Sequence, residues 1–189
     1  MLVQSGSEPL PVGLVAQIAP KLNKLLHTSA QGEVLRPGAE ALKYMLMHDH
    51  QQVFEWQDDQ GNNGLVVCLH IIDRLLSPSV EDNAASEVGG LAAELVEKAG
   101  HQRLGTDLLQ RLLQAVAKRL STAQAAPFIQ SLILVFARLC LNAAGDVVQF
   151  LGQITVPTKD GEENGLKVVL SKWLENSINF AGYDEIRQK

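Results

Sequence analysis

Residues 127–141 read PFIQSLILVFARLCL, and this stretch decides the fold. Phe128, Leu132, Val135 and Leu139 recur at the spacing of one helical face. A second apolar set lies beside them on the same helix: Ile129, Ile133, Phe136 and Cys140. A helix that is apolar around most of its circumference has to be covered on more than one side. We therefore expect an inner helix, with neighbours before and after it in the chain.

The composition also favours a helical protein outside the membrane. A membrane span needs roughly 18 or more uninterrupted apolar residues, and Arg138 interrupts the run at 127–141. Apolar residues make up 46% of the 189-residue chain and aromatics only 5%, so Leu, Val, Ile and Ala must build the core. A β-sandwich would need more aromatic and β-branched residues. We therefore predict an all-α fold without membrane insertion.

Charge and cysteine content limit the partners and the compartment. The formal net charge is −5 at pH 7, which argues against a nucleic-acid-binding surface and permits a basic partner. Cys68 and Cys140 both fall within apolar helical patterns, and Cys68 is best interpreted as a small buried hydrophobe. Because there is no spaced set of cysteines to form a disulfide framework, a reducing compartment is the simpler interpretation.

Two interleaved series of helices recur along the chain. The first series ends in related segments that place cations at Lys24, Arg74 and Lys118, 44 to 50 residues apart. Helices of the second series are expected to end on the residue that best accepts a left-handed C-cap conformation: Gly100, Gly145 and Gly182. A period in the forties is typical of HEAT and armadillo arrays.

The pattern predicts an α-α superhelix, a HEAT/armadillo-like solenoid of about four helix pairs. The first helices of the pairs are expected at residues 11–27, 64–76, 104–120 and 146–154. The second helices are expected at residues 33–47, 84–98, 123–142 and 165–178. Residues 49–63 and 156–164 are expected to be loops. Residues 1–189 would then form one continuous solenoid, truncated at both ends, since neither end resembles a polar capping repeat.

The start of the inner helix has two possible positions. Ser121 and Gln124 have the spacing of a capping box, which favours a start at Ala123. Pro127 fits better if the helix starts near Ala126, because proline is tolerated in the first helical turn.

Several long runs resemble the importin-β (karyopherin-β) family. They include SLILVFARLCL at 131–141 and LKVVLSKWLENSINFAGYDEIRQK at 166–189, with further runs at 35–56 and 75–105. The resemblance implies an α-solenoid nuclear transport receptor that shuttles between cytoplasm and nucleus and contacts nucleoporins. It also implies basic protein cargo, such as core histones and ribosomal proteins, under control of the GTPase Ran. The family's main Ran contacts lie in N-terminal repeats, which we expect to be outside this stretch. A generic HEAT scaffold that holds subunits of a complex stays open as the alternative.

Two acidic stretches are the candidate surface for a basic partner. Residues 79–97 hold five acidic residues and no Lys or Arg, and residues 49–63 hold four, again without Lys or Arg. If both face a common groove, their field would speed capture of a basic partner, whereas most charge runs on helices are simply solvated. Phe54 and Trp56 either tuck back onto the domain or anchor a partner. The candidate residues are Asp49, Glu55, Asp58, Asp59, Glu81, Asp82 and Glu87.

No motif in the sequence indicates catalysis, a cofactor or a metal. There is no G-x-S-x-G nucleophile elbow and no G-x-x-x-x-G-K-[ST] phosphate loop. His48 and His50 flank Asp49, but residues two apart on a helix point to different faces, so both could bind one metal only from a non-helical turn. Gly89 and Gly90 indicate close helix packing rather than phosphate binding. We therefore expect a protein that is not an enzyme.

Overall fold

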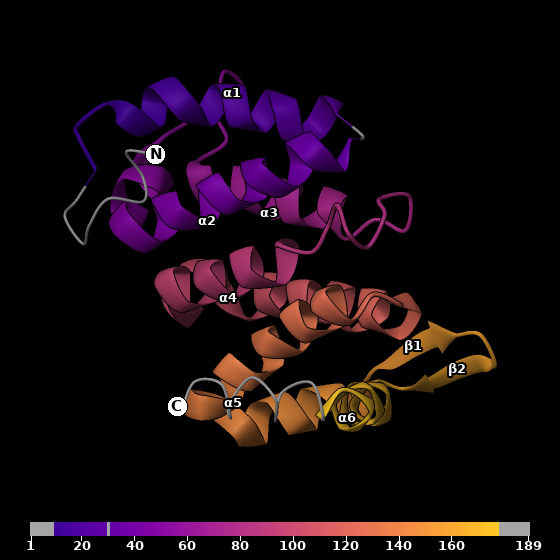
Figure 1. Cartoon of the computed structure of the whole chain (residues 1–189). Coiled ribbons are helices and arrows are strands. Elements are labelled where there is room, and N and C mark those ends of the chain that lie inside the picture. The colour runs from indigo at the N-terminus through magenta and orange to yellow at the C-terminus, as the bar shows by residue number, and fades with distance from the viewer. Residues whose placement is uncertain (1–9, 30, 178–189) are drawn as a thin grey trace, which may run out of the picture.

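The computed structural model describes residues 10–29 and 31–177 and consists mainly of stacked helices (Figure 1). A small antiparallel hairpin projects from one side near the C-terminal end of the described chain. The elements in chain order are α1 (Leu14–Thr28), α2 (Gly32–Glu55), α3 (Gly64–Leu75), α4 (Val88–Thr122), α5 (Ala126–Gln153), β1 (Thr155–Thr158), β2 (Gly161–Asn164) and α6 (Gly165–Glu175).

Breaks inside the two longest helices produce the predicted pairs. Helix α4 is interrupted at Gly100 (φ 64°) and Gly105 (φ 71°), a left-handed conformation that costs glycine little. Helix α5 is interrupted at Ala143 (φ −147°, ψ 46°). The chain therefore forms four pairs: α1 with α2, α3 with residues 88–99, residues 106–122 with 126–142, and residues 144–153 with α6. This confirms the predicted solenoid of about four helix pairs, which stack in succession in Figure 1.

Several local predictions were wrong. Gly145 does not end the first part of α5. The break falls two residues earlier, at Ala143, and Gly145 already belongs to the second part of the helix. Gly182 lies outside the described residues. Residues 49–55 are helical rather than part of a loop, since α2 bends at Asp49 and continues to Glu55.

The segment at 156–164 is also not a plain loop. Thr155 pairs with Asn164 and Thr158 with Gly161, so β1 and β2 form a hairpin with a two-residue connection. Ser121 donates a hydrogen bond from Oγ to the Pro157 carbonyl oxygen at 2.7 Å, which ties the hairpin to the end of α4. The all-α prediction was therefore wrong at this hairpin, which is the one departure from helices and loops in the described residues.

The inner helix begins at Ala126, with Pro127 in its first turn. The capping box was wrong because Ser121 is still inside α4, where its hydroxyl oxygen also lies 2.7 Å from the Lys118 carbonyl oxygen, the alternative acceptor for its one hydrogen. The interior positions were predicted correctly. Phe128, Leu132, Val135 and Phe136 are all at most 1% exposed.

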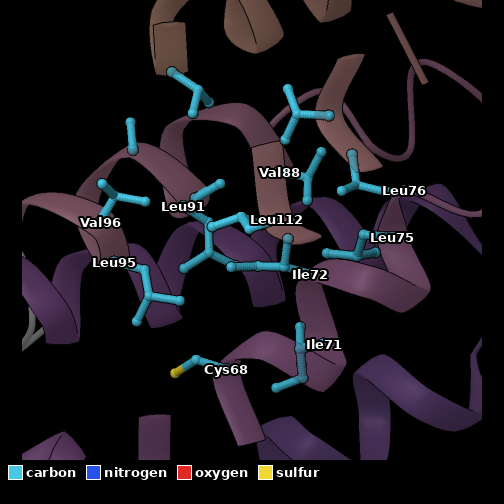
Figure 2. Close-up of a cluster of buried hydrophobic side chains, with 14 of the residues drawn as sticks. Cys68, Ile71, Ile72, Leu75, Leu76, Val88, Leu91, Leu95, Val96 and Leu112 are labelled. Carbon is cyan, nitrogen blue, oxygen red and sulfur yellow. The ribbon is translucent and has the colours of Figure 1, made fainter. Parts of the chain in front are cut away.

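One continuous core runs between the pairs. Figure 2 shows the side chains of Ile72, Leu91 and Leu112 meeting, one from α3 and two from the separate parts of α4. Cys68 lies in the same region and is 1% exposed, which confirms its interpretation as a buried hydrophobe. Burial raises the pKa of the Cys68 thiol to about 12, so this cysteine is protonated at neutral pH.

Glycine allows α4 and α5 to approach each other closely. A Cβ atom at Gly89 would overlap the carbonyl group of Ser131 on α5. By contrast, a Cβ at Gly90 would meet only the flexible end of Lys43, with Cδ 3.3 Å away. The predicted packing role is therefore confirmed for Gly89.

Helix α5 is long and apolar enough to cross a membrane by length and composition alone. In the structure one face of α5 packs against α4. Arg138, which interrupts the apolar run, donates from Nη1 to Glu94 at 2.7 Å and to Glu97 at 3.2 Å on α4.

Candidate interaction surface

The two acidic stretches do not lie side by side along their length. Ala84, within the first stretch, packs against Gly32 at the start of α2, whereas Glu55 is the last residue of that helix. At about 1.5 Å of rise per residue, the 24-residue α2 would be roughly 36 Å long if it were straight, and its bend at Asp49 shortens this only in the last turns. The first acidic stretch therefore begins near the start of α2, whereas the second begins in the last turns of that helix.

Asp82 is held by several internal contacts. Its Oδ1 accepts a hydrogen bond from Arg119 Nη2 at 2.9 Å, and its Oδ2 accepts from the backbone amides of Gln124 (2.7 Å) and Ala125 (2.9 Å). Partial burial alone would raise the pKa of Asp82, but the two amides and the Arg119 guanidinium outweigh burial and lower it. Asp82 thus caps the start of α5 from a distant loop.

Other acidic residues of the same stretch also have internal partners. Glu87 accepts from Lys43 Nζ of α2 at 3.2 Å. Glu94 and Glu97 share Arg138 of α5, and the Glu94 side chain is only 9% exposed. Glu81 is exposed at the surface. Much of the predicted negative field over residues 79–97 is therefore neutralised by cations from other helices.

The acidic residues at the end of α2 have different roles. Asp49 sits at the bend, where its Oδ1 accepts from the Gln52 amide at 3.1 Å and its Oδ2 accepts from Gln52 Nε2. Gln52 in turn accepts from the Val15 amide and so joins α2 to α1. Glu55 is exposed and accepts from Gln51 Nε2 at 3.1 Å. Asp49 is thus a local cap, and Glu55 faces solvent.

Asp58 and Asp59 lie in the loop of residues 56–63, which lines a pocket together with residues of α1 and α3. Asp58 Oδ1 accepts from the amides of Gln60 and Asn62, and Oδ2 accepts from Asn62 Nδ2 at 3.0 Å. The hydrogen bond from the Asn62 side chain is the main cause that lowers the pKa of Asp58, and the backbone amides add to it. The Asp58 carboxylate is therefore charged at neutral pH. Asp59 is exposed beside it.

The aromatic and histidine side chains nearby pack on the domain. Phe54 is buried beneath the Arg103 guanidinium, whose carbon lies 5.1 Å from the ring centre, and Trp56 is half-buried against the core. His48 stacks on Tyr44, and His50 meets the edge of Phe54. Within residues 10–29 and 31–177 no cluster of three or more His, Cys, Asp or Glu could hold a metal ion.

Sequence reasoning missed Arg119. Its side chain is 7% exposed, donates from Nη2 to the Val80 carbonyl oxygen at 2.9 Å, and lies with Cζ 4.9 Å from the centre of the Phe128 ring. In the sequence Arg119 is simply the second of two adjacent cations, after Lys118, which by itself indicates neither a partner nor burial.

The fold places the chain among helical-repeat proteins built from stacked helix pairs. No family model matches the chain. It is similar to importin subunit beta-5 of Schizosaccharomyces pombe, with 31% identity over 189 residues, 98% of this chain and 18% of that protein. It is also 28% identical to importin subunit beta-5 of Saccharomyces cerevisiae over 167 residues, 88% of this chain and 15% of that protein.

The chain is therefore similar in sequence, over most of its own length, to a segment of two importin beta-5 subunits. It spans less than one fifth of the length of the curated relatives that it matches.

Proposed function

We propose that this chain is a segment of a nuclear import receptor that binds basic protein cargo, such as core histones or ribosomal proteins. The finer assignment within the family, to an importin-9-type receptor, is part of this proposal. Control by Ran-GTP, contact with nucleoporins and shuttling between cytoplasm and nucleus would belong to the complete receptor. The observation that carries the proposal is the similarity to two importin subunits over most of a helix-pair solenoid.

The charge distribution supports a basic rather than an acidic cargo. The chain carries a net charge of −5, and Glu55, Asp59 and Glu81 are exposed acidic side chains. Negative surface charge raises the local concentration of a cationic protein and speeds its association. Because Asp82 and Glu87 are engaged by Arg119 and Lys43, we assign them a structural role and not a contact with cargo.

Binding of the 189-residue chain to a purified core histone dimer tests this proposal. We expect saturable binding at low salt that exceeds binding to an acidic protein of similar size by at least about tenfold, since opposite net charges steer encounter. Equal, weak binding to both proteins would contradict cargo binding by this segment. That result would favour the alternative, a helical-repeat scaffold that holds subunits of a complex.

A further inference from the structure

A pocket of about 280 Å³ lies between α1, the loop of residues 56–63 and α3. Its lining includes Asn23 and His27 from α1, Asp58 and Asp59 from the loop, and His70 from α3. This volume lies just below the range typical of small-molecule sites, so the pocket has room for one long side chain. Its walls are mainly polar, which distinguishes it from a gap in the apolar core.

The loop that forms one wall is held in place at both ends. Gln57 pairs with Asn63 in an antiparallel bridge, and the Asn63 side chain accepts from the Val66 amide to cap α3. Within the loop, Asp58 accepts from two backbone amides and from Asn62 Nδ2. The Asp58 carboxylate is therefore fixed in position before any ligand arrives, which reduces the entropy cost of binding.

The chemistry of the lining selects a cation that donates hydrogen bonds. Asp58 and Asp59 bring two carboxylates, and Asn23 Oδ1 is a buried acceptor without a hydrogen-bond partner in the described part of the chain. Burial, followed by the charges of Arg74 and His70, lowers the pKa of His27, so this ring is neutral at pH 7. An anion would meet two carboxylates here, and a metal ion would lack a compact set of ligands.

We propose that this pocket receives a lysine or arginine side chain of a basic protein partner. The ammonium or guanidinium group would donate to the carboxylates of Asp58 and Asp59, while its aliphatic stem would lie along Val67 on the pocket wall. The inference rests on the proposed function for the identity of the partner, but the pocket's preference for a cation follows from its own residues.

The test uses the full chain and a fluorescein-labelled tetra-arginine peptide, with binding followed by fluorescence anisotropy. Asp59→Asn removes one carboxylate from the pocket without touching the hydrogen bonds that hold the loop. Asp160→Asn is the matched control, because Asp160 is an exposed aspartate in the turn between β1 and β2. We expect Asp59→Asn to weaken peptide binding about fivefold and Asp160→Asn to leave it nearly unchanged.

The pH dependence adds a second readout. The titratable and charged residues that surround His27 are Arg74 and His70 from α3 and the two loop aspartates. Protonation of His27 would add a positive charge beside the pocket, so peptide affinity in the wild type should fall once the pH drops below the usual titration range of histidine. His27→Gln should remove part of that fall. If the affinity of His27→Gln falls with pH as much as that of the wild type, the result would contradict binding of the peptide beside His27.

The outcomes separate the pocket from the proposed function. Equal losses for Asp59→Asn and Asp160→Asn would overturn the pocket and indicate uniform surface attraction. Retention of full histone-dimer affinity by Asp59→Asn, despite loss of peptide binding, would overturn its use by a basic protein. A wild-type chain that binds the peptide in this pocket but binds no histone dimer would refute cargo binding while leaving the cation preference intact.

Discussion

Asp82 and Arg119 are 37 residues apart in sequence and form an ion pair of 2.9 Å between the loop after α3 and the last turns of α4. The same carboxylate accepts from the two amides that precede α5, and the same guanidinium covers the face of Phe128. One pair of side chains therefore fixes the junction at which the second helix pair meets the third.

Removal of Asp82 should destabilise the whole chain. Arg119 is 7% exposed, so Asp82→Ala leaves a buried charge without its partner and two amides without their acceptor. We expect a loss of about 3 kcal/mol in the free energy of unfolding, measured by urea denaturation. Asp160→Ala, at an exposed turn, should change stability by less than about 0.5 kcal/mol. Similar losses for both variants would contradict this role of Asp82.

The same residue should make stability depend on acid. The pKa of Asp82 is lowered in the folded state, so the folded chain binds fewer protons than the unfolded chain around the unfolded pKa of 3.8. Its contribution is therefore complete above that pH and is lost as the pH falls through the lower, folded-state pKa. The stability gap between wild type and Asp82→Asn should narrow as the pH falls below about 4. Urea titrations at several pH values measure this gap, and a gap constant with pH would refute the prediction.

Gly89 offers a test of the close approach between α4 and α5. A methyl group at this position would overlap the Ser131 carbonyl, so Gly89→Ala should destabilise the chain by about 2 kcal/mol or more. Gly145→Ala is the control, because no other side chain or helix of the described residues comes within 4 Å of a Cβ atom at this position. The control should be neutral or stabilising by up to about 1 kcal/mol, because alanine is the better helix former. The midpoints of thermal unfolding of the two variants measure this difference, and equal midpoints would contradict the close approach of α4 and α5 at Gly89.

Phe136 tests the assignment of the inner helix. Its side chain is 1% exposed, and Phe136→Ala should cost about 3–5 kcal/mol, because it removes a large apolar side chain and leaves a cavity. Helix content measured by circular dichroism below the unfolding transition should stay close to that of the wild type. A loss under about 1 kcal/mol would mean that the site collapses readily and is not a packed core.

The sequence predicts the helix pairs because their apolar spacing is local. The interior positions from Phe128 to Phe136 follow from a 3.6-residue period within one helix. The hairpin at 155–164 was missed although Asp160-Gly161 is a common hairpin signal, because residues 156–164 were interpreted only as a turn-rich loop. Gly145 was misassigned because a glycine near a helix end is compatible with both a cap and a continuing helix.

The candidate surface could be predicted only as a set of charges. Asp82 and Glu87 belong to a stretch without cations, yet their partners Arg119 and Lys43 lie on other helices, 37 and 44 residues away. A count of neighbouring charges contains no information about such pairs. The pocket beside Asp58 was missed for the same reason, because His27 and His70 reach it from two helices that only the fold brings together.

Salt should weaken binding of a basic cargo to this chain. The acidic residues available at the surface include Glu55, Asp59 and Glu81, all exposed, and such charges are screened over about 8 Å at physiological ionic strength. Affinity for a core histone dimer should therefore fall steeply between low and moderate salt. Most of the change should appear in the association rate, since long-range steering acts on encounter more than on residence.

A triple variant, Glu55→Gln with Asp59→Asn and Glu81→Gln, should reproduce the effect of salt at low ionic strength. It spares Asp82 and Glu87, whose ion pairs hold helices together, so its helix content and unfolding midpoint should match those of the wild type. Stopped-flow association with a labelled histone dimer, at two salt concentrations for both proteins, measures the effect. The wild type should lose association rate with salt, and the variant should start slower and lose less. Four equal rates would mean that these carboxylates are ordinary solvated surface and that cargo, if bound, is held by other contacts.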